Sequence, residues 1–231
     1  MFLTLFAVTL LAASQTLVNA APALEIQTKF IVTPFDLIQM GARSDCTTTD
    51  ECRNATQAAP FVNSALRKYR IVSTGERAAL LSLIIFESVG FAFDINHSEN
   101  NPGQGTRNQM NFPFILEYAL DTPRVAKEAQ ALLGPYIDNP SAIPSATKNA
   151  IRELVLADDL SFASAMWFYT RRGPKQTGCL EIPGMVEGLQ DESVSGWQNY
   201  LTQCIGTTVT EPRRRLWQQA LTVLKPAIAS T

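Results

Sequence analysis

A long apolar stretch in the middle of the chain constrains the fold most strongly. Residues 82–93, SLIIFESVGFAF, hold a single carboxylate, Glu87, among Leu, Ile, Val and Phe. The preceding residues STGE fit a capping box, in which the Ser73 hydroxyl accepts a hydrogen bond from the Glu76 amide while the Glu76 side chain reaches back. The pattern predicts a mostly buried helix over residues 75–91, with Glu87 near its C-terminal end.

Apolar residues recur at the helical period along much of the chain, between frequent Pro and Gly residues. The other predicted helices cover residues 56–68, 123–133, 145–156, 158–171, 194–205 and 211–224. Residues 94–110, DINHSENNPGQGTRNQM, break this spacing and are rich in Asn and Gly, so they predict a loop or a short hairpin. We therefore expect a mainly α fold, with a small hairpin or loop subdomain beside the Glu87 helix.

The first twenty residues have the pattern of a secretory signal peptide. Residues 2–13 are apolar, and Val18 and Ala20 fit the small-residue cleavage site. Residues 21–231 then form a single domain, and no later segment is apolar for long enough to cross a bilayer. We expect a secreted, extracellular protein.

The cysteines and sequons agree with that compartment. The four cysteines are Cys46, Cys52, Cys179 and Cys204. In an oxidising compartment they allow three pairings, and the sequential pairing is favoured because each bond closes a short local loop. The sequons NAT at Asn54 and NHS at Asn96 predict N-glycans on surface loops if the host is a eukaryote.

The charge pattern excludes several classes of partner. The formal net charge is −2 with both signs mixed, so no extended basic surface is available for nucleic acid or an anionic membrane. The basic run at 213–215 falls in a predicted helix and is interpreted as a solvated face. The single histidine, His97, lies in a sequon and is poorly placed for a catalytic triad, while bridged cysteines leave zinc without ligands. We expect a monomer with no metal and no cofactor.

Glu87 is the first candidate for chemistry. Apolar surroundings and the negative end of the helix dipole both favour the protonated form of a carboxylic acid, which could then donate a proton. The alternatives are a wetted strip of the helix or a structural salt bridge to Arg107 or another base. The helix alone leaves these interpretations open.

The loop after this helix offers a second group of candidates. Its polar side chains suit sugar hydroxyl and acetamido groups, and they are Gln104, Thr106, Arg107, Asn108 and Gln109. The alternative is an ordinary polar loop that is stabilised by its own contacts.

The order of these motifs resembles the lysozyme-like superfamily, and most of all its lytic transglycosylase and goose-type branch. In that branch a helix ends in Glu-Ser with an aromatic residue soon after, and a Gly-x-Met-Gln-type segment follows. FESVGF matches the first feature, whereas GTRNQM matches the second only loosely, after a longer insertion. The resemblance implies that Glu87 is the catalytic acid and Ser88 its usual neighbour. Similar GQGTRN segments occur in secreted fungal proteins of this type, which favours a fungal source.

A second segment, residues 161–175 with the sequence SFASAMWFYTRRGPK, resembles the WFW helix of plant-type chitinases, another branch of the superfamily. Adjacent aromatic residues on a helix cannot all face one way. We therefore expect at least two of Trp167, Phe168 and Tyr169 in the core. The resemblance implies that one of the three lines the cleft and stacks on a sugar ring, with Trp167 and Tyr169 as the candidates.

These resemblances together imply a secreted glycoside hydrolase that cleaves β-1,4 linkages in polymers of N-acetylated amino sugars, with peptidoglycan as the first choice. Chitin or chitosan is the alternative substrate, and a glycan-binding effector without activity is the alternative class. Glycoside hydrolysis commonly needs a second carboxylate. Asp94 and Glu99 are the candidates, although Asp94 could instead cap the turn after the helix, and the goose-type branch often works with a single Glu.

Overall fold

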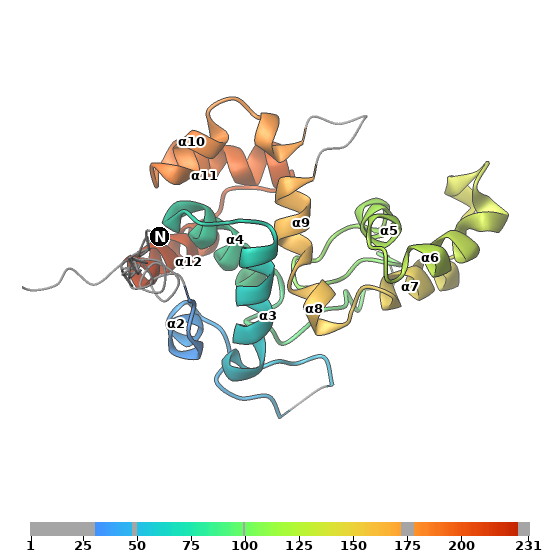
Figure 1. Cartoon of the computed structure of the whole chain (residues 1–231), viewed down its shortest axis with the longest axis horizontal. Coiled ribbons are helices and arrows are strands. Elements are labelled where there is room, and N and C mark those ends of the chain that lie inside the picture. Colours follow the sequence, from blue (N-terminus) through green and yellow to red (C-terminus); the bar gives the residue numbers. More distant parts are fainter. Residues whose placement is uncertain (1–30, 48–49, 99, 172–177, 226–231) are drawn as a thin grey trace, which may run out of the picture. The chain divides into compact units, whose positions relative to one another are not determined.

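The computed structural model describes residues 31–47, 50–98, 100–171 and 178–225 (Figure 1). The chain divides into two units, Met1–Ile31 and Val32–Thr231, and the fold described below belongs to the second. The predicted signal peptide, residues 1–20, lies outside the described residues, as does the second candidate carboxylate Glu99.

The described residues are mainly helical and contain no β-strand, which confirms the predicted mainly α fold. The α-helices are α2 (Pro34–Gln39), α3 (Ala55–Lys68), α4 (Thr74–Glu87), α5 (Phe112–Asp121), α6 (Ala126–Leu133), α7 (Ser145–Glu153), α8 (Asp158–Ser161), α9 (Ser164–Thr170), α10 (Met185–Gln190), α11 (Val194–Asn199) and α12 (Glu211–Leu224). Three short 3-10 turns are η1 (Gly134–Tyr136), η2 (Pro140–Ala142) and η3 (Cys179–Glu181), and η4 (Tyr200–Ile205) is a π-helical turn. In place of a regular hairpin, the segment 94–110 has two isolated antiparallel bridges, Ile95 with Gly105 and Gly105 with Met110.

Helix α4 is the buried helix that the apolar stretch predicts, and it packs against α12, α10 and α9. Its start differs in detail from the capping box. The Ser73 hydroxyl accepts from the Glu76 amide at 3.2 Å, but it also donates to Glu76 Oε2 at 2.6 Å. Glu76 Oε1 accepts from the Tyr169 hydroxyl at 2.9 Å. The Glu76 carboxylate therefore links the start of α4 to α9.

Helix α4 ends four residues before the predicted boundary. Ser88 is its C-cap, and the Ser88 hydroxyl donates to Ile84 O at 2.6 Å and accepts from Phe91 N at 2.9 Å. The next residues turn into the left-handed region, with Gly90 at φ 69°. A Cβ on Gly90 would lie 2.8 Å from Gly41 O, so a close approach of two backbone segments also fixes this turn.

Other boundaries show where local spacing succeeds and fails. The predicted helices 56–68 and 211–224 match α3 and α12 to within one residue. The predicted helix 158–171 is split into α8 and α9, because the Ser161 carbonyl accepts from Arg107 N and from the Ser164 hydroxyl in place of continuing one helix. The predicted helix 194–205 changes after Asn199 into the π-helical turn.

The C-terminal helices are joined by aromatic packing and a disulfide. Trp197 of α11 stacks on Trp217 of α12 with ring centroids 4.9 Å apart. The bond between Cys179 and Cys204 links η3 to η4. The second disulfide joins Cys46 to Cys52 and closes a loop before α3. These are the sequential pairs that the short loops favoured.

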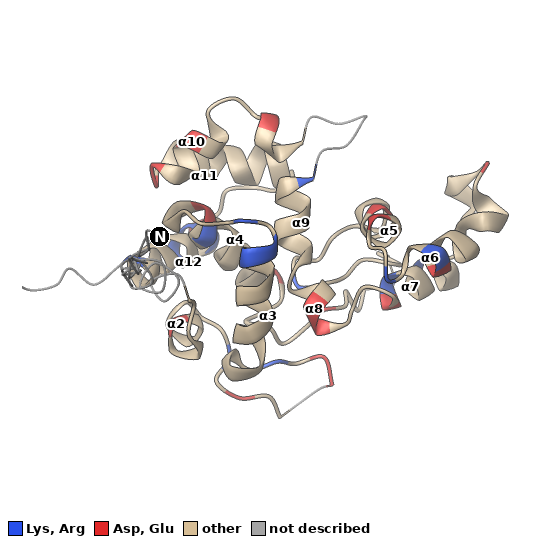
Figure 2. Cartoon of the chain, in the orientation of Figure 1, with Lys and Arg blue, Asp and Glu red and all other residues tan. Residues whose placement is uncertain are grey.

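The surface carries charges of both signs, and the helices are not of the membrane-spanning kind in the described ranges. Acidic and basic residues are interspersed among the described elements (Figure 2). Within the described ranges, every helix is too short or too polar to span a lipid bilayer.

Candidate functional site

A pocket of about 390 Å³ lies between the loop after α4 and helix α7. The loop contributes residues 95–98, Asn101 and Pro102, and α7 contributes Ser145, Asn149 and Arg152. Small-molecule sites in proteins have volumes of about 300–1,000 Å³, so this pocket has the size for a small organic molecule.

The α7 wall of the pocket follows from helical spacing. Ser145, Asn149 and Arg152 lie four and then three residues apart, which places them along one face of the helix. Asn149 Oδ1 accepts a hydrogen bond from Gly103 N at 2.8 Å, so this side chain also holds the loop against α7. Arg152 is only 8% exposed, and its Nη2 donates to Glu153 Oε1 at 2.7 Å.

The loop wall is held by hydrogen bonds within the loop. Asn96 Nδ2 donates to Gln104 Oε1 at 2.6 Å, and Asn96 Oδ1 accepts from Ser98 N at 2.8 Å. Gln104 Nε2 donates to Gln109 O at 2.9 Å. The loop wall of the pocket is therefore ordered by its own side chains, as the polar-loop alternative expects.

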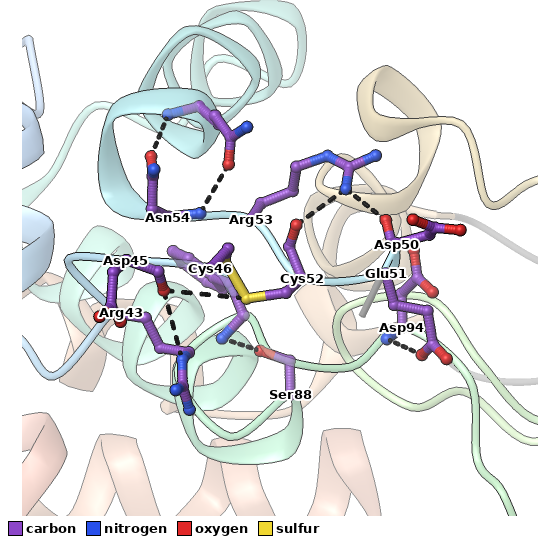
Figure 3. The surroundings of a disulfide bond; sticks show 12 residues. Arg43, Asp45, Cys46, Asp50, Glu51, Cys52, Arg53, Asn54, Ser88 and Asp94 are labelled. Carbon is purple, nitrogen blue, oxygen red and sulfur yellow. Dashed lines mark hydrogen bonds between the residues drawn. A yellow bond between two sulfur atoms is a disulfide. The ribbon is translucent and has the colours of Figure 1, made fainter. Parts of the chain in front are cut away.

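Glu51 fixes the start of this loop from the other side (Figure 3). Its Oε2 accepts from the backbone amides of Asp94 at 3.2 Å and Ile95 at 3.3 Å. Its Oε1 lies 2.8 Å from His97 Nε2. Because Glu51 precedes Cys52, the loop closed by the Cys46–Cys52 disulfide is joined directly to the pocket wall.

A buried ionic cluster lies behind the same loop. Arg107 is fully buried, and its guanidinium donates to Phe91 O at 3.0 Å and to Glu51 O at 2.6 Å. Its Nη2 lies 3.5 Å from Asp94 Oδ2 and 3.8 Å from Asp158 Oδ1. Both terminal nitrogens of the guanidinium are occupied by protein groups, so Arg107 acts here as a structural residue.

Burial sets the ionisation of Asp94. Removal from water raises the pKa of Asp94 to about 6, and this effect outweighs the opposing attraction of the Arg107 guanidinium. The carboxylates of Glu51 and Asp158 act in the same direction as burial. Asp94 therefore changes its charge in a mildly acidic range.

The two candidate catalytic carboxylates have different partners. Glu87 Oε1 lies 2.7 Å from Arg213 Nη1 of α12, whereas Asp94 contacts Arg107. Neither carboxylate lines the pocket. The structure thus gives Glu87 the structural salt bridge that the sequence left open as an alternative, and the base is Arg213.

The other candidate binding residues are engaged within the protein. The Thr106 hydroxyl contacts Gly105 O and Asn108 Oδ1, and Asn108 Oδ1 also lies 2.7 Å from the Ser164 hydroxyl. Trp167 and Tyr169 belong to the hydrophobic core. Trp167 Nε1 donates to Asp121 Oδ2 at 2.7 Å. Neither ring therefore offers an open face on which a sugar could stack.

The sequons occupy different settings. Asn54 is the N-cap of α3, where its Oδ1 accepts from Gln57 N at 3.0 Å. Asn96 lines the pocket, and its side-chain amide is bonded at both ends. Within the described ranges, no three His, Cys, Asp or Glu side chains are grouped as metal ligands.

The fold and the site thus define a mainly helical, disulfide-bonded protein with a small polar pocket. The chain is 32% identical over 167 residues to a bifunctional dioxygenase–epoxy alcohol synthase from Fusarium oxysporum, a match that covers 72% of this chain. The chain spans only 12% of the length of this relative. No family model matches the chain, and no solved structure matches it either.

This similarity corrects the functional hypothesis from the sequence. The relative is named for oxidative chemistry, so the assignment to the lysozyme-like superfamily is wrong, and so is the resemblance to plant-type chitinases. The same finding overturns glycoside hydrolysis, the glycan-binding alternative and a polysaccharide partner such as peptidoglycan or chitin. The resemblance rested on a short local motif, and Glu87 in that motif pairs with a distant arginine.

Sequence reasoning missed the residues that build the pocket. Arg152 and Asn149 lie in the predicted helix 145–156, where their spacing from Ser145 already puts three polar side chains on one face. Glu51 adjoins a cysteine, but nothing local indicates that it binds the amides of Asp94 and Ile95. Those contacts join segments that are far apart in the sequence.

Proposed function

We propose that this chain is a small-molecule-binding domain that serves oxidative chemistry, and that the pocket between the loop 95–102 and α7 holds an oxygenated organic ligand. The observation that carries this proposal is the pocket itself, which has a volume of about 390 Å³. The hydrogen bond from Gly103 N to Asn149 Oδ1 joins its two walls. The similarity to a dioxygenase–epoxy alcohol synthase supports the chemical class. The two disulfides support an oxidising compartment, such as the secretory route.

The pocket has donors and acceptors suited to such a ligand. An epoxy alcohol carries an epoxide oxygen that accepts hydrogen bonds and a hydroxyl that both donates and accepts. Ser98 and Ser145 bring hydroxyl groups to the pocket wall, and Ile95 and Pro102 bring apolar surface for a carbon skeleton. Most of the lining residues are polar, so hydrogen bonding would supply most of the recognition of such a ligand.

Calorimetric titration tests this proposal. We expect the purified protein to bind a short epoxyhexanol, and we expect Ser145→Phe to weaken binding because the added ring fills the pocket. Ala146→Phe is the matched control, since Ala146 lies on the same turn of α7, is exposed and does not line the pocket. Absence of binding by the wild type to every oxygenated six-carbon ligand tested would overturn the proposal.

A second candidate is that the chain itself performs an oxidative step, and the 32% identity to a named dioxygenase favours it. The direct measurement is oxygen uptake by the purified chain with unsaturated substrates. Oxygen uptake that depends on the chain supports this candidate. If the chain binds the ligand but causes no oxygen uptake, the binding-domain proposal stands instead.

A further inference from the structure

We propose that the pocket is selective for an anion, and that its ligand carries a carboxylate that Arg152 recognises. This inference rests on the proposed function, because it names the chemical class of the ligand in the same pocket. It is carried by the position of Arg152, a cation that is only 8% exposed and lines the pocket wall.

The guanidinium of Arg152 is incompletely paired. Among the described residues it makes one hydrogen bond, from Nη2 to Glu153 Oε1 at 2.7 Å, which is also an ion pair, and the Glu153 side chain is 55% exposed to solvent. Its Nε is buried and has no partner among the described residues. A buried charge is expensive unless it is paired and hydrogen-bonded, and a guanidinium has further N–H donors beyond the one in use. Arg152 already has one counter-charge in Glu153, and an anionic ligand in the pocket would offer acceptors to the remaining N–H donors of its guanidinium.

The surrounding structure holds Arg152 at this place. The side-chain stem passes Gly105 so closely that a Cβ on that residue would lie 2.7 Å from Arg152 Cδ. The loop beyond Gly105 is fixed by its bridges to Ile95 and Met110. Arg152 is therefore positioned by the same loop that forms the opposite wall, which holds its guanidinium in a fixed place from which it can recognise a carboxylate.

The other described lining residues add donors. None of the described lining residues is Asp or Glu, although the lining residues His97 and Arg152 are paired with Glu51 and Glu153 behind the wall. Ser145 begins α7, and its N-cap Pro144 supplies no side-chain acceptor, so the first-turn amides lack a cap. Helix N-termini favour negative charge. Asn149 Oδ1 is engaged by Gly103 N, which leaves Nδ2 as a donor.

The test compares two ligands of similar size and shape, of which one ends in an anionic carboxylate and the other in a neutral amide. Hydroxyhexanoate and hydroxyhexanamide share a carbon skeleton and a hydroxyl, and calorimetry gives the affinity of the wild type for each. We expect the carboxylate to bind at least about tenfold more tightly, as for a buried charge-assisted hydrogen bond. Arg152→Gln should remove this preference while the amide binds as before, and Arg152→Lys should retain part of it.

Arg124→Gln is the matched control, because Arg124 pairs with Asp159 on the surface and does not line the pocket. It should leave both affinities unchanged. Equal binding of the two ligands to the wild type would overturn the anion inference while the binding function stands. Failure of both ligands, and of neutral epoxyhexanol, would overturn the proposed function as well. A carboxylate preference that survives in folded Arg152→Gln would overturn the role of Arg152.

Discussion

Glu87 Oε1 lies 2.7 Å from Arg213 Nη1, and this ion pair joins the C-terminal end of α4 to α12. The two side chains are 22% and 13% exposed, and the guanidinium also lies 4.2 Å from the centre of the Phe86 ring. The contact is close in distance but lacks hydrogen-bond geometry, so charge attraction accounts for it. The carboxylate in the middle of the apolar stretch therefore has a structural partner.

Glu87→Gln should destabilise the protein without affecting the pocket. The variant leaves the Arg213 guanidinium largely buried without its counter-charge, which should cost about 1–3 kcal/mol of the free energy of unfolding. Urea denaturation checks this value, and the double variant with Arg213→Met should recover part of the loss. An unchanged unfolding midpoint in Glu87→Gln would show that the ion pair contributes nothing to the free energy of unfolding.

The raised pKa of Asp94 predicts that the free energy of unfolding falls as the pH rises. Its folded-state pKa of about 6 is above the value of 3.8 in an unfolded chain, so the folded state binds the extra proton between these values. Stability from this group is therefore greatest below about pH 4 and is lost as the pH rises through about 6, by at most about 3 kcal/mol. Asp94→Asn should flatten the unfolding free energy over this range relative to the wild type. The same slope in both proteins would contradict the burial effect.

Part of this architecture could be predicted because its signals are local. The Asn54 and Thr210 caps and the apolar spacing that follows them define α3 and α12. The splitting of residues 158–171 could not be predicted, because it depends on Arg107 N reaching the Ser161 carbonyl from a distant segment.

The candidate site was harder to predict for the same physical reason. A Glu at the end of an apolar helix has the same local sequence whether it faces a cleft or an arginine, and only the packing of α4 on α12 decides between them. The pocket likewise requires the loop 95–102 and α7 to meet. Helical spacing gives the polar face of α7 but not what lies opposite it.

The two disulfides should have separable effects. Loss of the Cys46–Cys52 bond frees the segment that carries Glu51, so Cys46→Ala with Cys52→Ala should weaken ligand binding in the pocket. Its loop is short, so chain entropy assigns it only about 2 kcal/mol of stability, against about 3–4 kcal/mol for the 25-residue separation of Cys179 and Cys204.

The matched control is the double alanine variant of Cys179 and Cys204, which should lower the melting temperature more but leave ligand affinity unchanged. Melting curves and calorimetry on both variants provide the comparison. If the two variants reduce affinity equally, the disulfide loop before α3 has no special link to the pocket.

Gly105 should be intolerant of even a methyl group. A Cβ there would lie 2.7 Å from both Asp94 O and Arg152 Cδ, so Gly105→Ala must displace the backbone or the arginine stem and should cost about 1–3 kcal/mol. Gly134 provides the control: its φ is −44°, and a Cβ there would meet nothing within 4 Å. Gly134→Ala should be neutral or stabilising by about 0.4–1 kcal/mol, because alanine reduces the entropy of the unfolded chain.

Since the clash at Gly105 falls on Arg152, Gly105→Ala should also reduce the preference for a carboxylate over its amide. A Gly105→Ala protein with wild-type stability and an unchanged preference would show that Arg152 is not fixed by this loop.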